Sequence, residues 1–134
     1  MRLLVLVYIL HSSSEWKVQA AAVWEQPMII ESVGVSVSLS KREELGRGLS
    51  SLLGPTRVEA GCVDCRLYQD VTDPNKFRLE TLWRTEDDLE RHVRSEGYKK
   101  LLFLMELGAE PPSIEFHEVS QTRGLEFIEE VRQT

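Results

Sequence analysis

Two side chains with useful chemistry, Trp83 and His92, lie close together in the segment LETLWRTEDDLERH, residues 79–92. Imidazole titrates near neutral pH, so a histidine can act as a base toward a hydroxyl group of a substrate. An indole ring offers a flat apolar wall against which another aromatic ring can pack. The pair would suit base chemistry on a small hydroxylated aromatic molecule. Alternatively, His92 has only a structural role at the edge of the core, where its ring hydrogen-bonds a carbonyl group.

The pattern around these residues predicts how they are positioned. Side chains alternate up to Arg84, which indicates a half-buried strand with Phe77, Thr81 and Trp83 on one face. Thr85 is then a suitable N-cap, and the acids that follow it suit the positive end of a helix dipole. A helix that folds back over the sheet from this point would bring His92 to the edge that carries Trp83.

The remaining elements follow from the same two periodicities. Alternation predicts strands at 28–39, 62–70 and 113–120, and a turn at 72–75 makes the second of these the hairpin partner of the strand before Thr85. Ser40 is expected to cap a leucine-striped helix that is broken at Gly54 and Pro55. Ser95 is expected to cap a further helix over 96–108, and residues 125–133 form a last amphipathic piece.

The resulting order of elements, βαββαβ, predicts an α+β fold of the ferredoxin-like kind with a four-stranded antiparallel sheet. Both central helices must then cover one face of the sheet. Apolar and small residues remain on the other face, so we expect a homodimer in which a second copy covers it.

Composition narrows the classes of function. The chain has 134 residues, enough for one domain, and its formal net charge of −6 and pI near 5.1 argue against a nucleic-acid surface or an anionic membrane face. Phosphate-binding loops, dinucleotide fingerprints and nucleophile elbows are absent from the sequence, so no cofactor is expected. A small organic ligand fits these observations best.

Residues 1–27 allow several interpretations, and the domain is expected to comprise residues 28–134. The first ten residues combine a basic start with a short apolar run, but HSSSEWK separates this run from the alanines at 20–22. The segment could be an upstream extension, with translation starting at Met28, an added strand or helix that packs on the domain or its partner, or a secretion signal. The run is too short to span a bilayer.

Cys62 and Cys65 have C-x-x-C spacing, which can mark a redox or zinc site. Within a strand, residues three apart point to opposite faces, so we expect two free thiols in a reducing cytoplasm. The same alternation places Tyr68 on the face of Cys62, in a structural or dimer-interface position. His117 is expected at the surface or an interface rather than as a metal ligand.

Two stretches, EAGCVDCRLYQDVTDPNKF and LWRTEDDLERHVRSEGYKKL, together with the phenylalanine of the last strand, resemble the antibiotic biosynthesis monooxygenase family. This family of dimeric α+β barrels includes the quinol monooxygenases, and the resemblance covers roughly residues 28–120. Two family positions differ here. Thr81 stands where a glutamate often precedes the tryptophan, and the strand-one asparagine of haem-degrading relatives has no counterpart.

The resemblance implies a cofactor-independent monooxygenase in which a quinol-like or polyphenolic substrate reacts with O2. It makes His92 the catalytic base and places Trp83, Tyr98 and Leu89 around the substrate. Because a fold does not fix a function, a non-catalytic module that binds a small aromatic molecule, for example in a stress response, is the alternative. A third possibility is haem binding through His92, for which we expect a negative titration.

Overall fold

The computed structural model describes residues 5–10, 16–22 and 26–134. Strands β1 (Val5–Leu10) and β2 (Trp16–Ala22) pair antiparallel with each other and form a sheet of their own. The interpretations of residues 1–27 also involve residues 1–4, 11–15 and 23–25, which lie outside the described part of the chain. They remain predictions, as does the domain boundary at residue 28.

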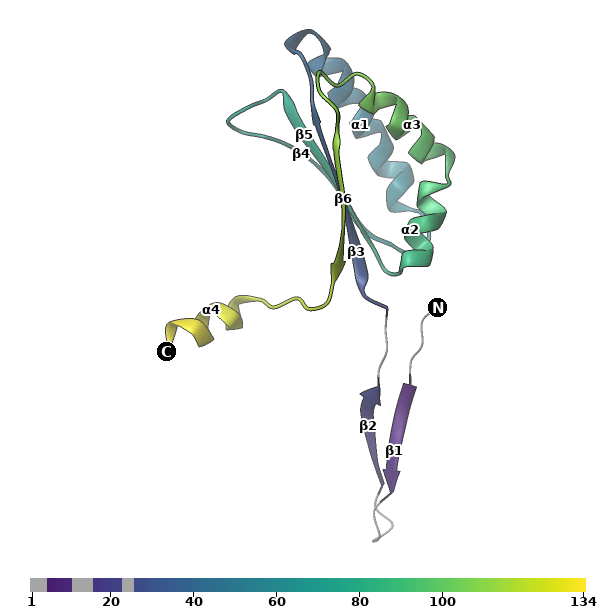
Figure 1. Cartoon of the computed structure of the whole chain (residues 1–134), viewed down its shortest axis with the longest axis vertical. Helices are drawn as coiled ribbons and strands as arrows, with labels where there is room; N and C mark the ends of the chain where they lie inside the picture. Colours follow the sequence, from purple (N-terminus) through teal and green to yellow (C-terminus); the bar gives the residue numbers. More distant parts are fainter. Residues whose placement is uncertain (1–4, 11–15, 23–25) are drawn as a thin grey trace.

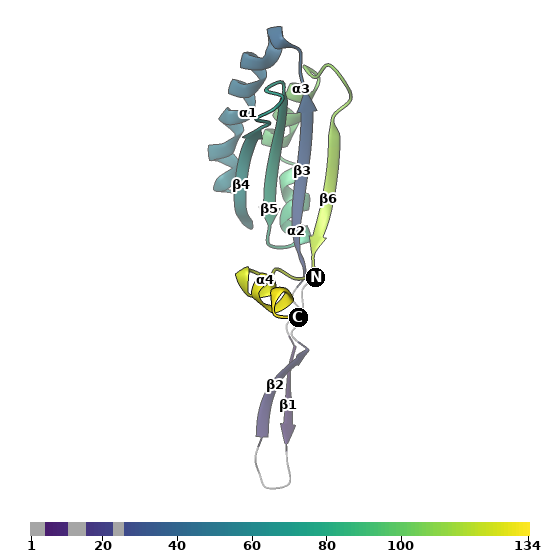
Figure 2. The same ribbon diagram turned by 90° about the vertical axis from the view of Figure 1, so that its left-hand side faces the viewer.

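The main sheet has four antiparallel strands in the order β4-β5-β3-β6 (Figure 2). They are β3 (Met28–Ser36), β4 (Cys62–Gln69), β5 (Lys76–Trp83) and β6 (Ser113–Val119). Strand β3 lies between β5 and β6, and its register sets Glu31 opposite Thr81 on one side and Phe116 on the other. This antiparallel sheet confirms the expected α+β, ferredoxin-like fold.

Three helices cover one side of this sheet: α1 (Arg42–Arg57), α2 (Glu86–Val93) and α3 (Glu96–Met105) (Figure 1). The last helix, α4 (Leu125–Arg132), follows β6 and extends on the opposite side. It buries none of its residues, and its apolar side chains Leu125, Ile128 and Val131 are all more than half exposed. An eight-residue helix with such an exposed stripe gains little stability by itself.

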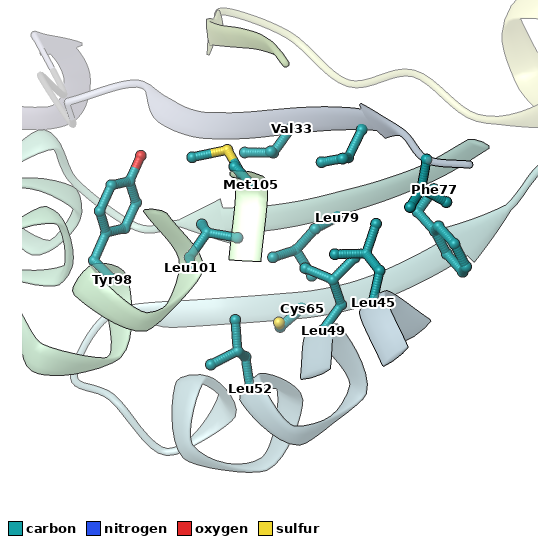
Figure 3. Close-up of a cluster of buried hydrophobic side chains, with 12 residues drawn as sticks. Val33, Leu45, Leu49, Leu52, Cys65, Phe77, Leu79, Tyr98, Leu101 and Met105 are labelled. Carbon is teal, nitrogen blue, oxygen red and sulfur yellow. The ribbon is translucent and has the colours of Figure 1, made fainter. Parts of the chain in front are cut away.

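The core fills the space between the sheet and the helices (Figure 3). Alternate residues of β3 and β5 point into it, and leucines of α1 and α3 pack on them. Tyr98 stands at one end of this cluster. The principal buried members are Val33, Val35, Val37, Leu45, Leu49, Leu52, Cys65, Phe77, Leu79 and Leu101.

The starts of α2 and α3 agree with the sequence. The hydroxyl of Thr85 accepts a hydrogen bond from the Asp88 backbone N–H at 3.2 Å, and three acids occupy the first turn of α2. The hydroxyl of Ser95 accepts from the Tyr98 N–H at 3.1 Å, which begins α3. These caps direct α2 back over the sheet immediately after β5, as the change of period predicts.

The start and the end of α1 differ from the sequence prediction. Ser40 is not its cap, because a 3-10 turn over Leu39–Lys41 precedes the helix. The strand predicted over 28–39 ends at Ser36, so Leu39 belongs to this turn and is exposed. Pro55 does not break the helix, which continues to Arg57. The proline lies in the last turn, where only one helical hydrogen bond is lost, and the preceding Gly54 has no Cβ to collide with the proline ring.

The prediction that Cys62 and Cys65 point to opposite faces of β4, with Tyr68 on the face of Cys62, is wrong. The register shifts between Cys62 and Asp64, so Cys62 lies opposite Trp83 and Cys65 lies opposite Thr81. Both cysteines therefore face the helices, and Tyr68 shares the other face with Asp64 and Arg66. A β-bulge adds one residue to a strand and thereby reverses the alternation, which the spacing of the cysteines does not reveal.

Candidate active site

His92, Trp83 and Tyr98 come together beneath α2 and α3. The imidazole of His92 stacks on the indole of Trp83, with ring centroids 4.4 Å apart and an interplanar angle of 27°. The ring of Tyr98 meets His92 edge-on at 5.2 Å. All three are buried, with exposed fractions of 4% for His92, 0% for Trp83 and 5% for Tyr98. The structure thus gathers three of the four predicted site residues, although their roles remain predictions.

A buried carboxylate that the sequence interpretation did not include, Glu31 of β3, completes this cluster. Its side chain is 1% exposed, and its Oε2 accepts a hydrogen bond from the hydroxyl of Tyr98 at 2.6 Å. Its Oε1 lies 3.8 Å from Nε2 of His92. A carboxylate buried this deeply must be compensated by hydrogen bonds or charge, and these contacts provide that compensation.

Thr81 connects Glu31 to Trp83. The indole N–H of Trp83 donates to the hydroxyl oxygen of Thr81 at 2.8 Å, and the Thr81 hydroxyl donates to Oε1 of Glu31 at 3.2 Å. Because Tyr98 donates to the other oxygen, both oxygens of Glu31 act as hydrogen-bond acceptors. Thr81, which stands where family members often have a glutamate, thus takes part in the network. The buried acid of this chain is Glu31, which comes from the neighbouring strand β3.

The other edge of His92 contacts a second carboxylate, Glu59, in the loop between α1 and β4. Nδ1 of His92 lies 2.9 Å from Oε1 and 3.1 Å from Oε2 of Glu59. The Glu59 side chain is 27% exposed, so this carboxylate reaches solvent, whereas Glu31 does not. The imidazole therefore lies between a buried acid and an accessible one.

The electrostatics of the cluster keep Tyr98 protonated. Burial, followed by the hydrogen bond to Glu31, raises the pKa of the Tyr98 phenol well above its usual range. Tyr98 is therefore a hydrogen-bond donor rather than a base near neutral pH. His92, with two ring nitrogens that can exchange a proton, is the side chain in this cluster best suited to general base chemistry.

A groove of about 440 Å³ opens beside this cluster, between α2 and the β3–β6 edge of the sheet. Its apolar lining comes from Ile29, Leu89, Val93 and Phe116. Ile29 and Leu89 also pack directly on Trp83, so the floor of the groove is the outer surface of the aromatic cluster. Leu89, the fourth predicted site residue, therefore lies between the groove and Trp83.

Glu31 could have been recognised from the sequence. Counted in steps of two, it shares the face of Val33, Val35 and Val37, and an acid on an otherwise apolar face of a strand is unusual. Glu59 carries no comparable signal, since its contact with His92 depends on the path of a loop. Among the remaining candidates, Tyr68 and His117 are both exposed, and both lie on the face of the sheet opposite this cluster.

The two cysteines are free thiols, and both lie on the helix side of β4. Burial and then the neighbouring Cys62 raise the pKa of Cys65 to about 12, while burial and then Glu59 raise the pKa of Cys62. A reactive thiol needs a lowered pKa, so these environments favour unreactive cysteines. Among the residues that the structure describes, no group of three or more His, Cys, Asp or Glu side chains could hold a metal ion.

The sequence comparison decides the family. The family model for antibiotic biosynthesis monooxygenases matches residues 28–102. The chain belongs to the antibiotic biosynthesis monooxygenase family. An uncharacterised protein of Synechocystis sp. (strain ATCC 27184 / PCC 6803 / Kazusa) is 24% identical over 102 residues, which is 75% of this chain and 69% of that protein.

Solved structures related to this monooxygenase-family chain share its fold. A conserved protein from Methanosarcina mazei Go1 is 25% identical, with a TM-score of 0.66 over 71% of this chain and 95% of that one. A protein from Deinococcus radiodurans, named as a candidate antibiotic biosynthesis monooxygenase, is 21% identical, with a TM-score of 0.66 over 72% and 96% of the two chains. Within the described part of the chain, no helix is long and apolar enough to cross a membrane.

Proposed function

We propose that this member of the family is a cofactor-independent monooxygenase that oxidises a quinol-like or polyphenolic molecule with O2. The observation that carries the proposal is the arrangement of His92. Its ring stacks on Trp83, and its Nε2 is directed toward the buried Glu31. Leu89 and Ile29 separate Trp83 from the apolar groove. A base held in an apolar aromatic site suits a substrate whose own ring supplies the reducing electrons.

The substrate ring would lie in the groove against Leu89 and Phe116. Phe116 is the cross-strand neighbour of Glu31 and is 51% exposed on an edge strand, so its side chain has room to turn aside. With Phe116 displaced, a hydroxyl group in the groove would approach both Glu31 and Nε2 of His92. Phe116 would thus control entry from the groove to the buried acid and base.

In the first step, His92 accepts a proton, so the substrate O–H bond breaks as an N–H bond forms at Nε2. The resulting anion is electron-rich and reduces O2. For a dihydroquinone, one oxygen atom enters the ring to give a hydroxyquinone and the other leaves as water, so the substrate supplies all the electrons. The protein contributes a base, a dry aromatic site and orientation of the ring.

Oxygen consumption with a panel of dihydroquinones tests this reaction. We expect uptake above autoxidation in buffer, and a loss of at least 100-fold in the His92→Gln variant, because general base catalysis typically contributes 10²–10⁴-fold. His117→Gln is the matched control, since His117 is about half exposed on the opposite face and should leave turnover unchanged. Equal turnover in wild type and His92→Gln would exclude His92 as the base.

A second candidate function is binding of a small aromatic molecule without turnover. It is favoured by the burial of His92 and Glu31, since a ligand that stays in the groove against Leu89 would lie outside this cluster and would not reach the base. Tight binding of an aromatic ligand, detected by quenching of tryptophan fluorescence, together with no product would support this function over catalysis. In an absorbance titration with haem, the Soret band should not shift or sharpen on adding the protein if His92 is held by Glu59.

The proposed assembly is a homodimer in a reducing cytoplasm, where Cys62 and Cys65 remain thiols. Within the part of the chain that the structure describes, the face of the sheet opposite α1, α2 and α3 is uncovered, and α4 extends on that side with its apolar stripe exposed (Figure 1). A second copy would cover both features about a two-fold axis.

A further inference from the structure

We propose that Glu59 is a positioning residue that holds the proton of neutral His92 on Nδ1, so that Nε2 carries the lone pair. This proposal deepens the proposed function, because a base must present an unprotonated nitrogen to its substrate. It concerns a residue outside the groove and outside the aromatic cluster. Its basis is the unequal arrangement of two carboxylates around one imidazole.

The two edges of the imidazole have different partners. Both oxygens of Glu59 are within hydrogen-bond distance of Nδ1, at 2.9 and 3.1 Å, whereas Glu31 approaches Nε2 no closer than 3.8 Å. The oxygens of Glu31 already accept hydrogen bonds from Thr81 and Tyr98. An N–H at Nδ1 therefore finds a free acceptor at bonding distance, and an N–H at Nε2 does not.

The backbone around Glu59 fixes this carboxylate in place. The N–H of Glu59 donates to the carbonyl of Thr56 at 3.1 Å, and its own carbonyl accepts from Cys62 N–H at 3.1 Å. A third backbone hydrogen bond holds the other end of the loop, because the carbonyl of Gly61 accepts from the Arg84 N–H at 2.8 Å. The loop is thereby tied both to α1 and to the segment that leads into α2, the helix that carries His92.

Close packing at Gly61 supports the same arrangement. This glycine has φ +83°, and a Cβ placed on it would collide with the carboxyl group of Asp88 in the first turn of α2. Only glycine allows the loop to approach the helix this closely. The loop that carries Glu59 and the helix that carries His92 are thus held next to each other, and the contacts with Nδ1 orient the Glu59 side chain.

This geometry also gives the proton a route out. When Nε2 accepts the substrate proton, the ring becomes an imidazolium whose Nδ1–H points at Glu59. Transfer of that proton to Glu59 leaves the neutral ring protonated on Nε2, and the Glu59 carboxyl group, 27% exposed, can exchange its proton with water. The Nδ1–H form returns when Nε2–H passes its proton to the oxygen that leaves as water and Nδ1 takes a proton back from Glu59. Glu31 has no such path, since it is almost completely buried.

Nitrogen-15 NMR of the imidazole tests the proposal without any substrate, because protonated and unprotonated ring nitrogens have well-separated shifts. At pH 8 we expect His92 of the wild type to be protonated at Nδ1 and unprotonated at Nε2, with its signals assigned through their loss in His92→Gln. In Glu59→Gln the amide oxygen still accepts from Nδ1–H, so the tautomer should persist. In Glu59→Ala the Nε2–H form should become the major one.

Glu44→Ala is the control, because Glu44 is an exposed acid of α1 whose ion pair to Lys41 lies at the surface; it should leave the His92 signals in place. A wild-type His92 protonated at Nε2, or a Glu59→Ala protein that keeps the Nδ1–H form, would overturn the proposal. If the tautomer follows the expected pattern while no dihydroquinone is oxidised, the role of Glu59 stands and the proposed reaction is wrong.

Discussion

Replacement of Thr81 by valine should destabilise the fold strongly, because one hydroxyl group serves two buried partners. Valine has nearly the same shape as threonine, so packing changes little while the hydroxyl is lost. The indole N–H of Trp83 then has no acceptor, and Oε1 of Glu31 loses its donor. Both groups are in residues that are at most 1% exposed, so water cannot replace the missing partner.

The expected magnitude follows from these two losses. An unsatisfied buried polar group costs about 1–3 kcal/mol, and a hydrogen bond to a charged group contributes about 1.5–3 kcal/mol. Taken together, Thr81→Val should lower the free energy of unfolding by about 3–5 kcal/mol, a large part of the roughly 5–15 kcal/mol that stabilises a typical domain. The midpoint of thermal unfolding should fall by roughly 10–20 °C.

Urea unfolding monitored by circular dichroism, at one protein concentration for all variants, measures this change. Thr81→Ser is the matched control, because it keeps the hydroxyl and removes only a methyl group, at a cost of about 1 kcal/mol. If Thr81→Val and Thr81→Ser were destabilised equally, the hydroxyl would contribute nothing, and the account of a continuous network from Trp83 to Glu31 would be refuted.

Three further predictions concern the loop, the thiols and the assembly. Gly61→Ala should destabilise the protein by more than 1 kcal/mol, because of its positive φ and the contact with Asp88. Gly97→Ala in α3 is the control: its Cβ would make only an ordinary contact with the Ser95 hydroxyl, so it should stabilise the protein by about 0.4–1 kcal/mol. The midpoints of urea unfolding compare the two variants. The pKa of Cys65 is raised from 9.0 to about 12, so between these pH values the unfolded chain loses a proton that the folded chain keeps. This contribution to stability is fully present below pH 9, and the free energy of unfolding should fall above it by up to about 1.4 kcal/mol per pH unit. Cys65→Ala should lose this pH dependence, and a variant with the same slope of unfolding free energy against pH as the wild type would contradict the prediction. The melting temperature should rise with protein concentration as expected for a dimer, and a monomer at micromolar concentration with a constant melting temperature would exclude the assembly.

Much of the fold was predictable because its signals are local. The alternation from Phe77 to Trp83 and the hydroxyl caps at Thr85 and Ser95 depend on residues next to them in the sequence, and the structure confirms each one. The 3-10 turn before α1 and the continuation through Pro55 were missed, because each depends on a small difference between backbone conformations that the residue types alone do not decide.

The candidate site was only partly predictable, for a different reason. Trp83 and His92 belong to neighbouring elements, so the path of one connection places them together. Glu31 joins them because of the register between β3 and β5, and Glu59 joins them through a contact between residues 33 positions apart in the chain. The bulge after Cys62 likewise depends on how β4 pairs with β5. Such long-range pairings are properties of the assembled sheet, and no short stretch of sequence contains them.

The elements around the cluster differ in how much each one contributes to the stability of the whole. Strand β3 is bonded on both edges, whereas α2 has eight residues, of which only Leu89 and His92 are buried. A short helix with two buried side chains can detach at a cost well below that of global unfolding. Amide hydrogens of α2 should therefore exchange faster than those of β3. Each such detachment would move Leu89 away from Trp83 and separate His92 from Glu59 at the same moment, so a ligand that slows α2 exchange would be reporting occupancy of the buried cluster.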